Sequence, residues 1–485
     1  MIRRIAGIIL LALATCGLTL AHSGKPDHHV IIDTDGALDD MRSLSMFLSG
    51  NDIRILAITC SQGTLLPESV YEKVMALLSA FHHEGIPVGL GGKIDSELPS
   101  WSSVALNVSW GTSSGTGTFS VQPDADELLT KTIIGYPEKI TLVALGSLKT
   151  YADWIRSNPQ HKDKIESIVW YNNHDVEDGF NYLVSPESFD FIKNTGIQLD
   201  IVSNNSDQFF VDDDYLAAIQ NTNSPYAGQI ELVYKQAAND ELTNRQHLQL
   251  WDDIVPLYVT VPLIFDPETE NNIRYVELNK GIPEVFIYET IAKLLESSTV
   301  TNNRVFNSFP VDPSLYKPAY VDILDKTIEK FGLIEWKAIS MTNEIHGHTG
   351  IYSIIGAKMG VRAMEYFNVG INNMTVITFA GSKPPLSCFN DGIQISTGAT
   401  IGQGLITVSD SISDIPTAIF EFNNQKVIIA LKPEYAEQMK KEIKIGVETH
   451  GLLTEKYWLY IENLALRYWR EYDRCEIFDF SISGT

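Results

Sequence analysis

The sequence predicts an α/β fold in which a doubly wound, mostly parallel sheet is followed by a smaller α+β domain. Three observations support this prediction. The chain has 485 residues, which corresponds to two or three domains at about 150 residues each. Short apolar runs alternate with segments of helical spacing from residue 30 onward, as in parallel sheets covered on both faces. After Gly332 the alternation gives way to a glycine-rich segment, 335–404.

The alternating elements can be placed in order along the chain. Helical spacing stops at Gly50 in one segment and covers 70–81 in the next. Ser185 and Pro186 suit the N-cap and first turn of a further helix. The apolar runs predicted as buried strands are 30–32, 53–59, 140–145, 165–171 and 199–203. In such a sheet the ligand binds beyond the carboxyl ends of the strands, so we expect the functional residues there.

The chain begins with the pattern of a secretory signal peptide, residues 1–21. Two arginines precede the apolar run 5–14, which is shorter than the roughly 20 residues of a membrane span. Small residues end at Ala21, where we expect cleavage, and a lipoprotein-type site at Cys16 is the alternative. We therefore expect an exported protein, periplasmic or at the cell surface, with no membrane span and either no anchor or a lipid anchor.

The charge balance excludes one class of partner. With 36 Lys and Arg against 61 Asp and Glu, the net charge is -25, and such a surface repels phosphate backbones. We therefore expect no nucleic-acid partner. The cysteines beyond the signal are far apart and form no disulfide framework. The change of pattern after Gly332 places a domain boundary near Leu333, which gives domains 22–332 and 333–485.

Four carboxylates lie within eight residues where the first strand ends and the first helix begins. Asp39 and Asp40 suit the positive end of a helix dipole, but Asp33 and Asp35 precede the helix. Only Arg42 is close enough in sequence to offset their charge. Crowded carboxylates repel one another unless a cation neutralises them. An oxygen-preferring ion such as Ca²⁺ suits this cluster.

The segment 33–40 resembles the opening motif of the inosine-uridine nucleoside hydrolases. The resemblance covers roughly 28–332 and implies calcium-dependent hydrolysis of the N-glycosidic bond of ribonucleosides, which gives ribose and free base. It also implies a nucleoside as the small-molecule partner, and we expect a homo-oligomer. Further segments that match the family in the same order are 55–59, 142–146, 180–181, 185–187 and 251–262.

The resemblance also implies roles for individual residues of this chain. Asp35 is expected to be both a calcium ligand and the general base, which accepts a proton from water. Asp39 and Asn181 are expected to hold the ribose hydroxyls. The full expected calcium site consists of the carboxylates of Asp35, Asp40 and Asp252 and the backbone carbonyl of Leu145.

Three positions depart from the family pattern. Thr64 replaces an Asn, and Gly179 stands where a sugar-binding Glu is usual, so that Asn173 is the candidate substitute. Trp251 replaces a His that protonates the departing base. The purine-specific members of the family resemble the chain here and use an aromatic stack, so we expect purine nucleosides to be preferred. The alternative for Trp251 is an aromatic residue of the core.

The glycine-rich segment carries a second candidate site. His346 and His348, with Cys388 and Asp391 farther along, suit a transition metal such as zinc. The spacing resembles the E-type module of formylmethanofuran dehydrogenase over roughly 335–408. Gly350 and Ala399 stand where this module commonly has Cys. A buried polar network without an ion is therefore the alternative.

Two rival functions remain open from the sequence. Thr64 and Gly179 motivate a nucleoside-binding protein that has lost turnover. A third interpretation makes the C-terminal module a metalloenzyme and the N-terminal domain its regulator. Release of free base from a nucleoside separates the first rival from the hydrolase.

Overall fold

The computed structural model describes residues 26–94, 97–111, 123–204, 209–237, 248–296, 303 and 305–482. The predicted signal peptide, with Cys16 and Ala21, lies outside these residues. The chain forms two compact units, Met1–Ser298 and Thr299–Thr485. Each unit is described by itself. Within the described residues, no helix combines the length and the apolar character that crossing a bilayer requires.

The first unit is built on an eight-stranded sheet with the order β3-β2-β1-β4-β5-β6-β8-β7. Every neighbouring pair is parallel except β7 and β8, which are antiparallel. This confirms the predicted mostly parallel sheet. The strands are β1 (His28–Thr34), β2 (Ile53–Cys60), β3 (Val88–Leu90), β4 (Ile140–Ala144), β5 (Ile165–Tyr171), β6 (Leu199–Ser203), β7 (Phe265–Glu270) and β8 (Ile273–Leu278).

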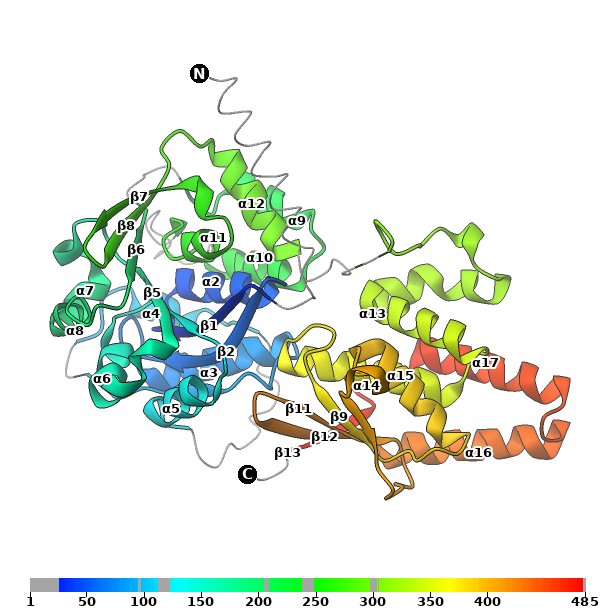
Figure 1. Ribbon diagram of the computed structural model, residues 1–485. Helices are drawn as coiled ribbons and strands as arrows, with labels where there is room; N and C mark the ends of the chain where they lie inside the picture. The colour runs from blue at the N-terminus through cyan, green and yellow to red at the C-terminus, as the bar shows by residue number, and fades with distance from the viewer. Residues whose placement is uncertain are drawn as a thin grey trace. The chain divides into compact units, whose positions relative to one another are not determined.

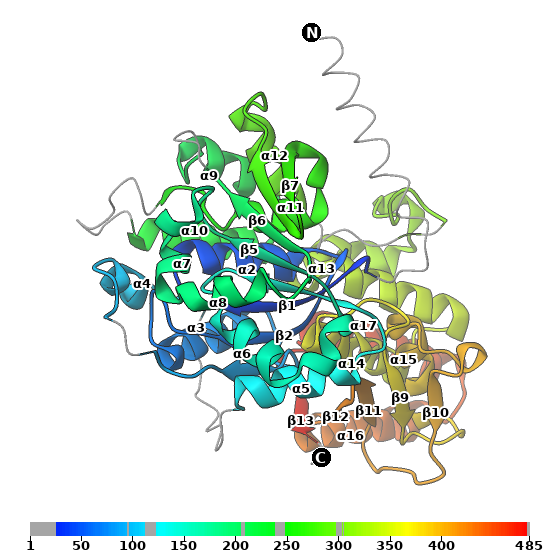
Figure 2. The ribbon, with the colours of Figure 1, turned by 60° about the vertical axis from the view of Figure 1, so that its left-hand side comes forward.

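Helices cover both faces of this sheet (Figures 1 and 2). Successive side chains of a strand point to opposite faces; in β1, Val30 and Ile32 belong to one apolar core and Ile31 to the other. With the first core pack α2 (Leu38–Ser49), α3 (Pro67–Ala80), α4 (Ser102–Asn107), α9 (Asp213–Gln220), α10 (Pro225–Ala237), α11 (Ile254–Thr260) and α12 (Glu284–Glu296). With the second pack α5 (Ala125–Gly135), α6 (Lys149–Ser157) and α8 (Pro186–Ile192).

The helix that the sequence placed after Ser185 begins as predicted but is capped differently. Ser185 is the N-cap residue of α8, yet its side chain makes no capping hydrogen bond. Its hydroxyl instead donates to Glu187 Oε1 at 2.6 Å. The short α7 (Phe180–Val184) precedes it. The described 3₁₀ helices are η1 (Pro159–Lys164), η2 (Val176–Asp178), η4 (Pro262–Ile264), η6 (Pro313–Leu315), η7 (Leu386–Cys388) and η8 (Ile401–Gln403).

The second unit is a smaller α+β structure around one apolar core. Its five-stranded sheet has the order β10-β9-β11-β12-β13, and only β9 and β10 are parallel. The strands are β9 (Thr375–Thr378), β10 (Ile406–Val408), β11 (Thr417–Phe422), β12 (Gln425–Leu431) and β13 (Phe478–Ile482). The helices are α13 (Pro318–His346), α14 (Ile351–Phe367), α15 (Phe389–Thr397), α16 (Pro433–His450) and α17 (Glu455–Glu471).

The two units divide between Ser298 and Thr299, earlier than the boundary that the sequence placed at Leu333. Helix α13 runs through that position, and Gly332 inside it has φ 83° and ψ 162°. Glycine reaches a positive φ without the strain of a Cβ, so α13 kinks there without ending. Ile323 before the kink and Trp336 after it belong to the same core. The change of pattern at Gly332 therefore marks a kink inside the second unit.

Candidate functional site

The residues predicted as a site in the first unit follow the carboxyl ends of neighbouring strands. Asp35 comes directly after β1, and Leu145 directly after β4, which pairs with β1. Asn181 lies in α7, in the connection that follows β5. This is the edge at which parallel α/β sheets bind their ligands.

Three carboxylates converge at this edge. Asp39 and Asp40 lie in the first turn of α2, and Asp252 lies shortly before α11. One carboxylate oxygen from each lies within 4.8 Å of the other two. Among the described residues, no other group of three His, Cys, Asp or Glu side chains is as compact. Two elements far apart in sequence thus bring these acids together, which fits the ligand set that a hard cation prefers.

The three acids are poorly compensated within the protein. Asp40 Oδ1 accepts the Thr34 hydroxyl at 2.7 Å and the Asp35 backbone N–H at 2.9 Å. Asp252 Oδ1 is buried and has no hydrogen-bond partner among the described residues. Burial, followed by the charges of Asp40 and Asp39, holds the pKa of Asp252 well above its ordinary value. Burial and the charge of Asp40 raise the pKa of Asp39 to about 7. A cation would relieve this repulsion.

Asp35, the predicted base, lies in a narrow slot beside this group. Its Oδ1 accepts the Ala37 N–H at 3.3 Å. A Cβ at Gly63 would lie 2.1 Å from Asp35 Oδ2, and one at Gly146 would lie 3.4 Å from it. Burial, then the charge of Asp40, raises the pKa of Asp35 well above its usual range, and hydrogen bonds from Thr64 oppose this. Thr64, one of the three departures, therefore acts directly on Asp35.

Asp33 has a different role from the other acids of the motif. Its carboxylate accepts the Thr59 hydroxyl at 2.5 Å and the Ser61 hydroxyl at 2.6 Å. It is fully buried, and burial raises its pKa to about 7. Asp33 therefore joins β1 to β2 and the residue that follows it, and it does not belong to the group of three carboxylates.

Arg42 is not spent on the cluster as its place in the sequence suggested. Its Nε and Nη2 donate to the two carboxylate oxygens of Asp253, both at 2.8 Å, and Nη2 also donates to the Gln249 carbonyl at 3.1 Å. Both side chains are buried. An interpretation from local charge missed this pair because Asp253 is 211 positions away.

The predicted ligand Leu145 and the predicted ribose contact Asn181 touch each other. The Asn181 Nδ2 donates to the Leu145 carbonyl at 2.6 Å and to the Tyr171 carbonyl at 3.1 Å. A carbonyl oxygen has two lone pairs, so the Leu145 oxygen keeps one acceptor site. Asn181 is buried and borders the carboxylates through Leu145, whose N–H bonds to the Asp33 carbonyl at 2.9 Å.

The loop after β5 explains the glycine at position 179. A Cβ there would lie 2.0 Å from Asn172 Oδ1. Asn172 is buried and holds the loop, since it donates to the Val176 carbonyl at 2.9 Å and accepts the Tyr182 N–H at 3.3 Å. Asn173, the proposed substitute for the missing Glu, is exposed and donates to the Asp178 carbonyl at 3.3 Å. The sequence drew attention to Asn173 and missed Asn172.

Trp251 directly precedes Asp252 and packs, half-buried, against the first core. It keeps part of its side chain accessible at the position next to the carboxylates. The structure is thus compatible with both sequence interpretations of Trp251, the core aromatic and the base stack.

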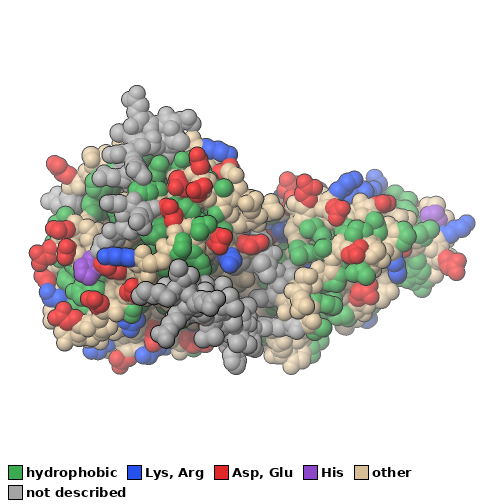
Figure 3. Space-filling model, turned by 90° about the horizontal axis from the view of Figure 1, so that it is seen from above, with side chains coloured by type: hydrophobic (Ala, Val, Ile, Leu, Met, Phe, Trp, Pro, Cys, Tyr) green, Lys and Arg blue, Asp and Glu red, His purple; other side chains and the backbone are tan. Residues whose placement is uncertain are grey.

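Two surface cavities lie away from these residues. One, of about 670 Å³, is lined by α9 and α12, with Tyr288 among its residues. The other, of about 530 Å³, is lined by the segment after β5 and by β7 and β8, with His174 and Tyr275. Neither is lined by the three carboxylates, so the donor set and not cavity size identifies the candidate site. On the face shown in Figure 3, acidic side chains are spread over the surface.

The second candidate site is partly assembled in the second unit. His346 Nδ1 and Asp391 Oδ2 are hydrogen-bonded at 2.7 Å. The His346 and His348 rings are 4.3 Å apart, and His346 Nε2 is buried with no hydrogen-bond partner among the described residues. Burial and the charge of His346 lower the pKa of His348. Burial raises the pKa of the Cys388 thiol. Asp391 thus orients His346, as a carboxylate does for a metal-binding His.

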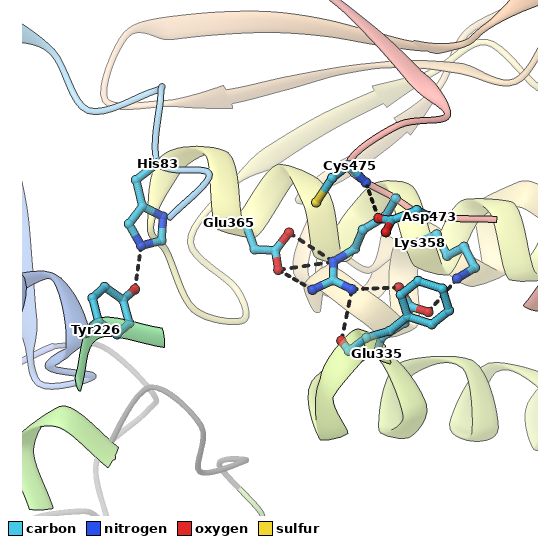
Figure 4. Close-up of polar contacts among 9 residues, drawn as sticks. His83, Tyr226, Glu335, Lys358, Glu365, Asp473 and Cys475 are labelled. Carbon is cyan, nitrogen blue, oxygen red and sulfur yellow. Dashed lines mark hydrogen bonds and ion pairs between the residues drawn. The ribbon is translucent and has the colours of Figure 1, made fainter. Parts of the chain in front are cut away.

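A buried charge network in the second unit has no counterpart in the sequence predictions. Lys358 and Glu335 are fully buried and pair at 2.5 Å, and Arg474 bridges Glu335 at 3.0 Å and Glu365 at 2.5 Å. Figure 4 shows this network, and it also shows the buried pair of His83 and Tyr226 in the first unit. The charged groups partner one another completely, as buried charges must. The network joins α13 and α14 to the segment before β13.

Comparisons with known proteins follow the two units. The model of the family described as inosine-uridine preferring nucleoside hydrolase matches residues 30–323. A model described as FmdE, molybdenum formylmethanofuran dehydrogenase operon, matches residues 345–470. Both agree with the resemblances found in the sequence.

Two curated relatives are pyrimidine-specific ribonucleoside hydrolases RihA. The one from Salmonella arizonae is 29% identical and the one from Citrobacter koseri 30%, each over 181 residues. These residues are 35% of this chain, and the chain spans 57% of the length of each relative.

Two solved structures have a similar chain path. A purine-preferring ribonucleoside hydrolase from Gardnerella vaginalis matches with a TM-score of 0.47 at 15% identity, over 55% of this chain and 99% of that one. An inosine-uridine preferring nucleoside hydrolase from Bacillus anthracis matches with a TM-score of 0.44 at 17% identity, over 56% and 99%.

Proposed function

Because the chain belongs, through residues 30–323, to the inosine-uridine preferring nucleoside hydrolase family, we propose that it hydrolyses the N-glycosidic bond of ribonucleosides. The products are ribose and the free base, calcium is the cofactor, and purine nucleosides are preferred. The observation that carries this proposal is the group Asp39, Asp40 and Asp252, whose carboxylate oxygens lie within 4.8 Å of one another.

The residues present fit a calcium ion. They offer carboxylate oxygens, which are the ligands that calcium prefers. The buried, unpartnered Oδ1 of Asp252 and the raised pKa values of Asp39 and Asp252 indicate that the described residues supply too little positive charge there. We assign Asp35, Asp40, Asp252 and the Leu145 carbonyl as ligands. Arg42 cannot take the place of the ion, because Asp253 occupies its guanidinium.

The residues around the ion divide the work of the reaction. When bound, calcium lowers the pKa of water that it coordinates. Asp35 accepts the proton of the attacking water, and its burial makes it a stronger base than an exposed carboxylate. Asp39 and Asn181 hold the ribose hydroxyls and so orient the sugar. The carboxylates also stabilise the positive charge that develops on ribose as the bond to the base breaks.

The preference for purines rests on Trp251. A half-buried indole next to Asp252 offers a flat face on which a two-ring base buries more area than a one-ring base. The curated relatives are called pyrimidine-specific, so a comparison of bases is the decisive measurement for this part of the proposal. Asn173 is retained as a secondary sugar contact that approaches only if its loop closes.

Chromatography of free base after incubation with inosine, adenosine, uridine or cytidine tests this function. We expect base release with calcium and none with EGTA, and faster release from the purine nucleosides. Asp35→Asn should bind nucleoside without releasing base, and Tyr226→Phe, far from the motif in sequence, should behave as wild type. A wild-type chain that binds nucleoside without releasing base would be the binding protein of the rival hypothesis.

We propose a transition-metal site, with zinc as the first candidate, in the second unit. The specific observation is His346, whose Nδ1 is fixed by Asp391 while its buried Nε2 has no partner among the described residues. His348 and Cys388 are the further ligands, although the four groups do not form a compact cluster by themselves in the described chain. Elemental analysis of the whole chain tests it: His346→Ala should lose the metal, and His450→Ala, on α16, should keep it. A metal-dependent reaction of this unit alone would favour the third interpretation.

The remaining proposals concern the whole protein. We propose that residues 1–21 direct export to the periplasm or cell surface, with lipidation at Cys16 as the alternative, and that the protein is a homo-oligomer. Fractionation of cells with a signal-deleted variant as control tests the first proposal, and light scattering tests the second.

A further inference from the structure

The segment that carries Asp252 is tied to α2 and to β6 at three places. Arg42 on α2 binds the Asp253 carboxylate with both arms of its guanidinium, at 2.8 Å each, and the Gln249 carbonyl at 3.1 Å. Asn204, at the end of β6, donates to the Leu250 carbonyl at 2.6 Å. The ties lie on both sides of Asp252, so the segment cannot shift relative to α2 without breaking them.

Asp253 is committed to this contact and not to its own helix. It is the N-cap residue of α11, where an Asp side chain usually accepts a backbone N–H of the first turn. Its side chain makes no such bond here, and it is fully buried against Arg42. A two-armed Arg–carboxylate pair fixes direction as well as distance.

Arg42 and Asp253 each adjoin a part of the carboxylate group. Arg42 follows Asp40 by two residues on α2, and Asp253 directly follows Asp252. The pair is neutral as a whole, so it adds no net charge to the site. Resting on the proposed calcium-dependent function, we propose that Arg42 and Asp253 are positioning residues that hold Asp252 opposite Asp39 and Asp40 and so set the affinity of the site for calcium.

The competing interpretation is that the pair only stabilises the fold. A buried polar contact elsewhere in the same unit separates the two. His83 Nε2 and the Tyr226 hydroxyl are hydrogen-bonded at 2.6 Å, and both residues are buried. His83 follows α3, which starts after β2 and returns along the sheet, so this pair lies toward the opposite edge from the carboxylates. Tyr226→Phe is therefore a matched control for lost stability alone.

Calorimetric titration of CaCl₂ into the EGTA-stripped full-length chain tests the proposal. Asp253→Asn keeps the shape of the side chain and removes its charge, and Arg42→Lys keeps the charge and removes the fork. We expect calcium affinity to fall about 10- to 100-fold in Asp253→Asn, as for other groups that orient metal ligands, and less in Arg42→Lys. Tyr226→Phe should lower the melting temperature of the stripped chain and leave calcium affinity close to that of wild type.

The outcomes separate this proposal from the proposed function. Calcium affinity of Asp253→Asn equal to that of wild type would overturn the positioning role and leave the calcium site intact. A wild-type chain that takes up no calcium would overturn both. If a single variant does not fold, the double variant Arg42→Met with Asp253→Leu leaves no unpaired buried charge; calcium affinity at the wild-type level in that variant would again overturn the proposal, and a loss of about tenfold or more would support it.

Discussion

Asp40 Oδ1 accepts the backbone N–H of Asp35 at 2.9 Å. This bond fixes a carboxylate of α2 to the chain directly after β1, and the Thr34 hydroxyl supports it from 2.7 Å. The proposed base and a proposed ligand are therefore held in one rigid turn before any ion or substrate arrives. Preorganisation of this kind limits the reorganisation that the reaction requires.

Replacing Asp40 should have opposite effects on calcium binding and on the metal-free fold. Asp40→Asn keeps an oxygen for the Asp35 N–H but removes one of three crowded charges, so we expect calcium affinity to fall about 100-fold. The stripped chain should melt at an equal or higher temperature than wild type, because repulsion with Asp39 and Asp252 is relieved. Calorimetry and thermal melting in EGTA measure the two effects. A lower melting temperature for the stripped variant would contradict the account of a charge-starved site.

Gly63 should be essential for the position of the base. A Cβ there would lie 2.1 Å from Asp35 Oδ2, so Gly63→Ala must displace the carboxylate. Since a displacement of about 1 Å costs about 100-fold in rate, we expect kcat to fall by that order. Gly92→Ala is the control, because nothing lies within 4 Å of its added Cβ. Equal kcat values for the two variants would show that Asp35 does not act where it lies.

The pH dependence of the metal-free fold should reflect Asp33. Burial raises its pKa from 3.8 to about 7 in the folded chain. The folded state then binds more protons than the unfolded state between these values, so this contribution to stability is present below about pH 4 and is lost as the pH rises toward about 7. Across this range, melting temperatures in EGTA should fall less steeply for Asp33→Asn than for wild type. The exposed Asp163→Asn is the control, and an unchanged slope in Asp33→Asn would contradict the assignment.

Restoring a side chain at position 179 should harm the protein. A Cβ at Gly179 would lie 2.0 Å from Asn172 Oδ1, so Gly179→Ala should destabilise the fold by about 1–3 kcal/mol. Shortening the neighbour in the double variant Gly179→Ala with Asn172→Ala should recover less than the full loss, because Asn172 also holds the Val176 carbonyl and the Tyr182 N–H. Denaturant melts measure both. A Gly179→Ala variant as stable as wild type would show that the loop is not fixed by Asn172.

The sequence was sufficient for those features that depend on local pattern. Alternating apolar runs predicted the parallel strands, and the spacing of Asp39 and Asp40 placed them in the first turn of a helix. The alternation could not show that Gly332 kinks α13 without ending it, because the residues on both sides share a core that only the folded chain reveals. The family resemblance, and not spacing, connected Asp252 to the first motif.

The pairing of charges was beyond prediction for a similar reason. Arg42 was expected to serve the nearby acids, yet its partner is 211 residues away. Lys358, an ordinary lysine in the sequence, is fully buried against Glu335. Which opposite charges meet depends on how distant segments pack, and no local period encodes it. The same holds for Asp33, whose partners Thr59 and Ser61 come from the neighbouring strand and the residue after it.

The most direct test of the central claim is the initial rate of hypoxanthine release from inosine across a series of EGTA-buffered calcium concentrations, for wild type and Asp252→Asn. We predict a rate that rises with free calcium and saturates in the wild type, and no calcium-dependent rate in Asp252→Asn. Equal release of hypoxanthine in EGTA and in calcium, or no release by the wild type at any calcium concentration, would contradict the claim.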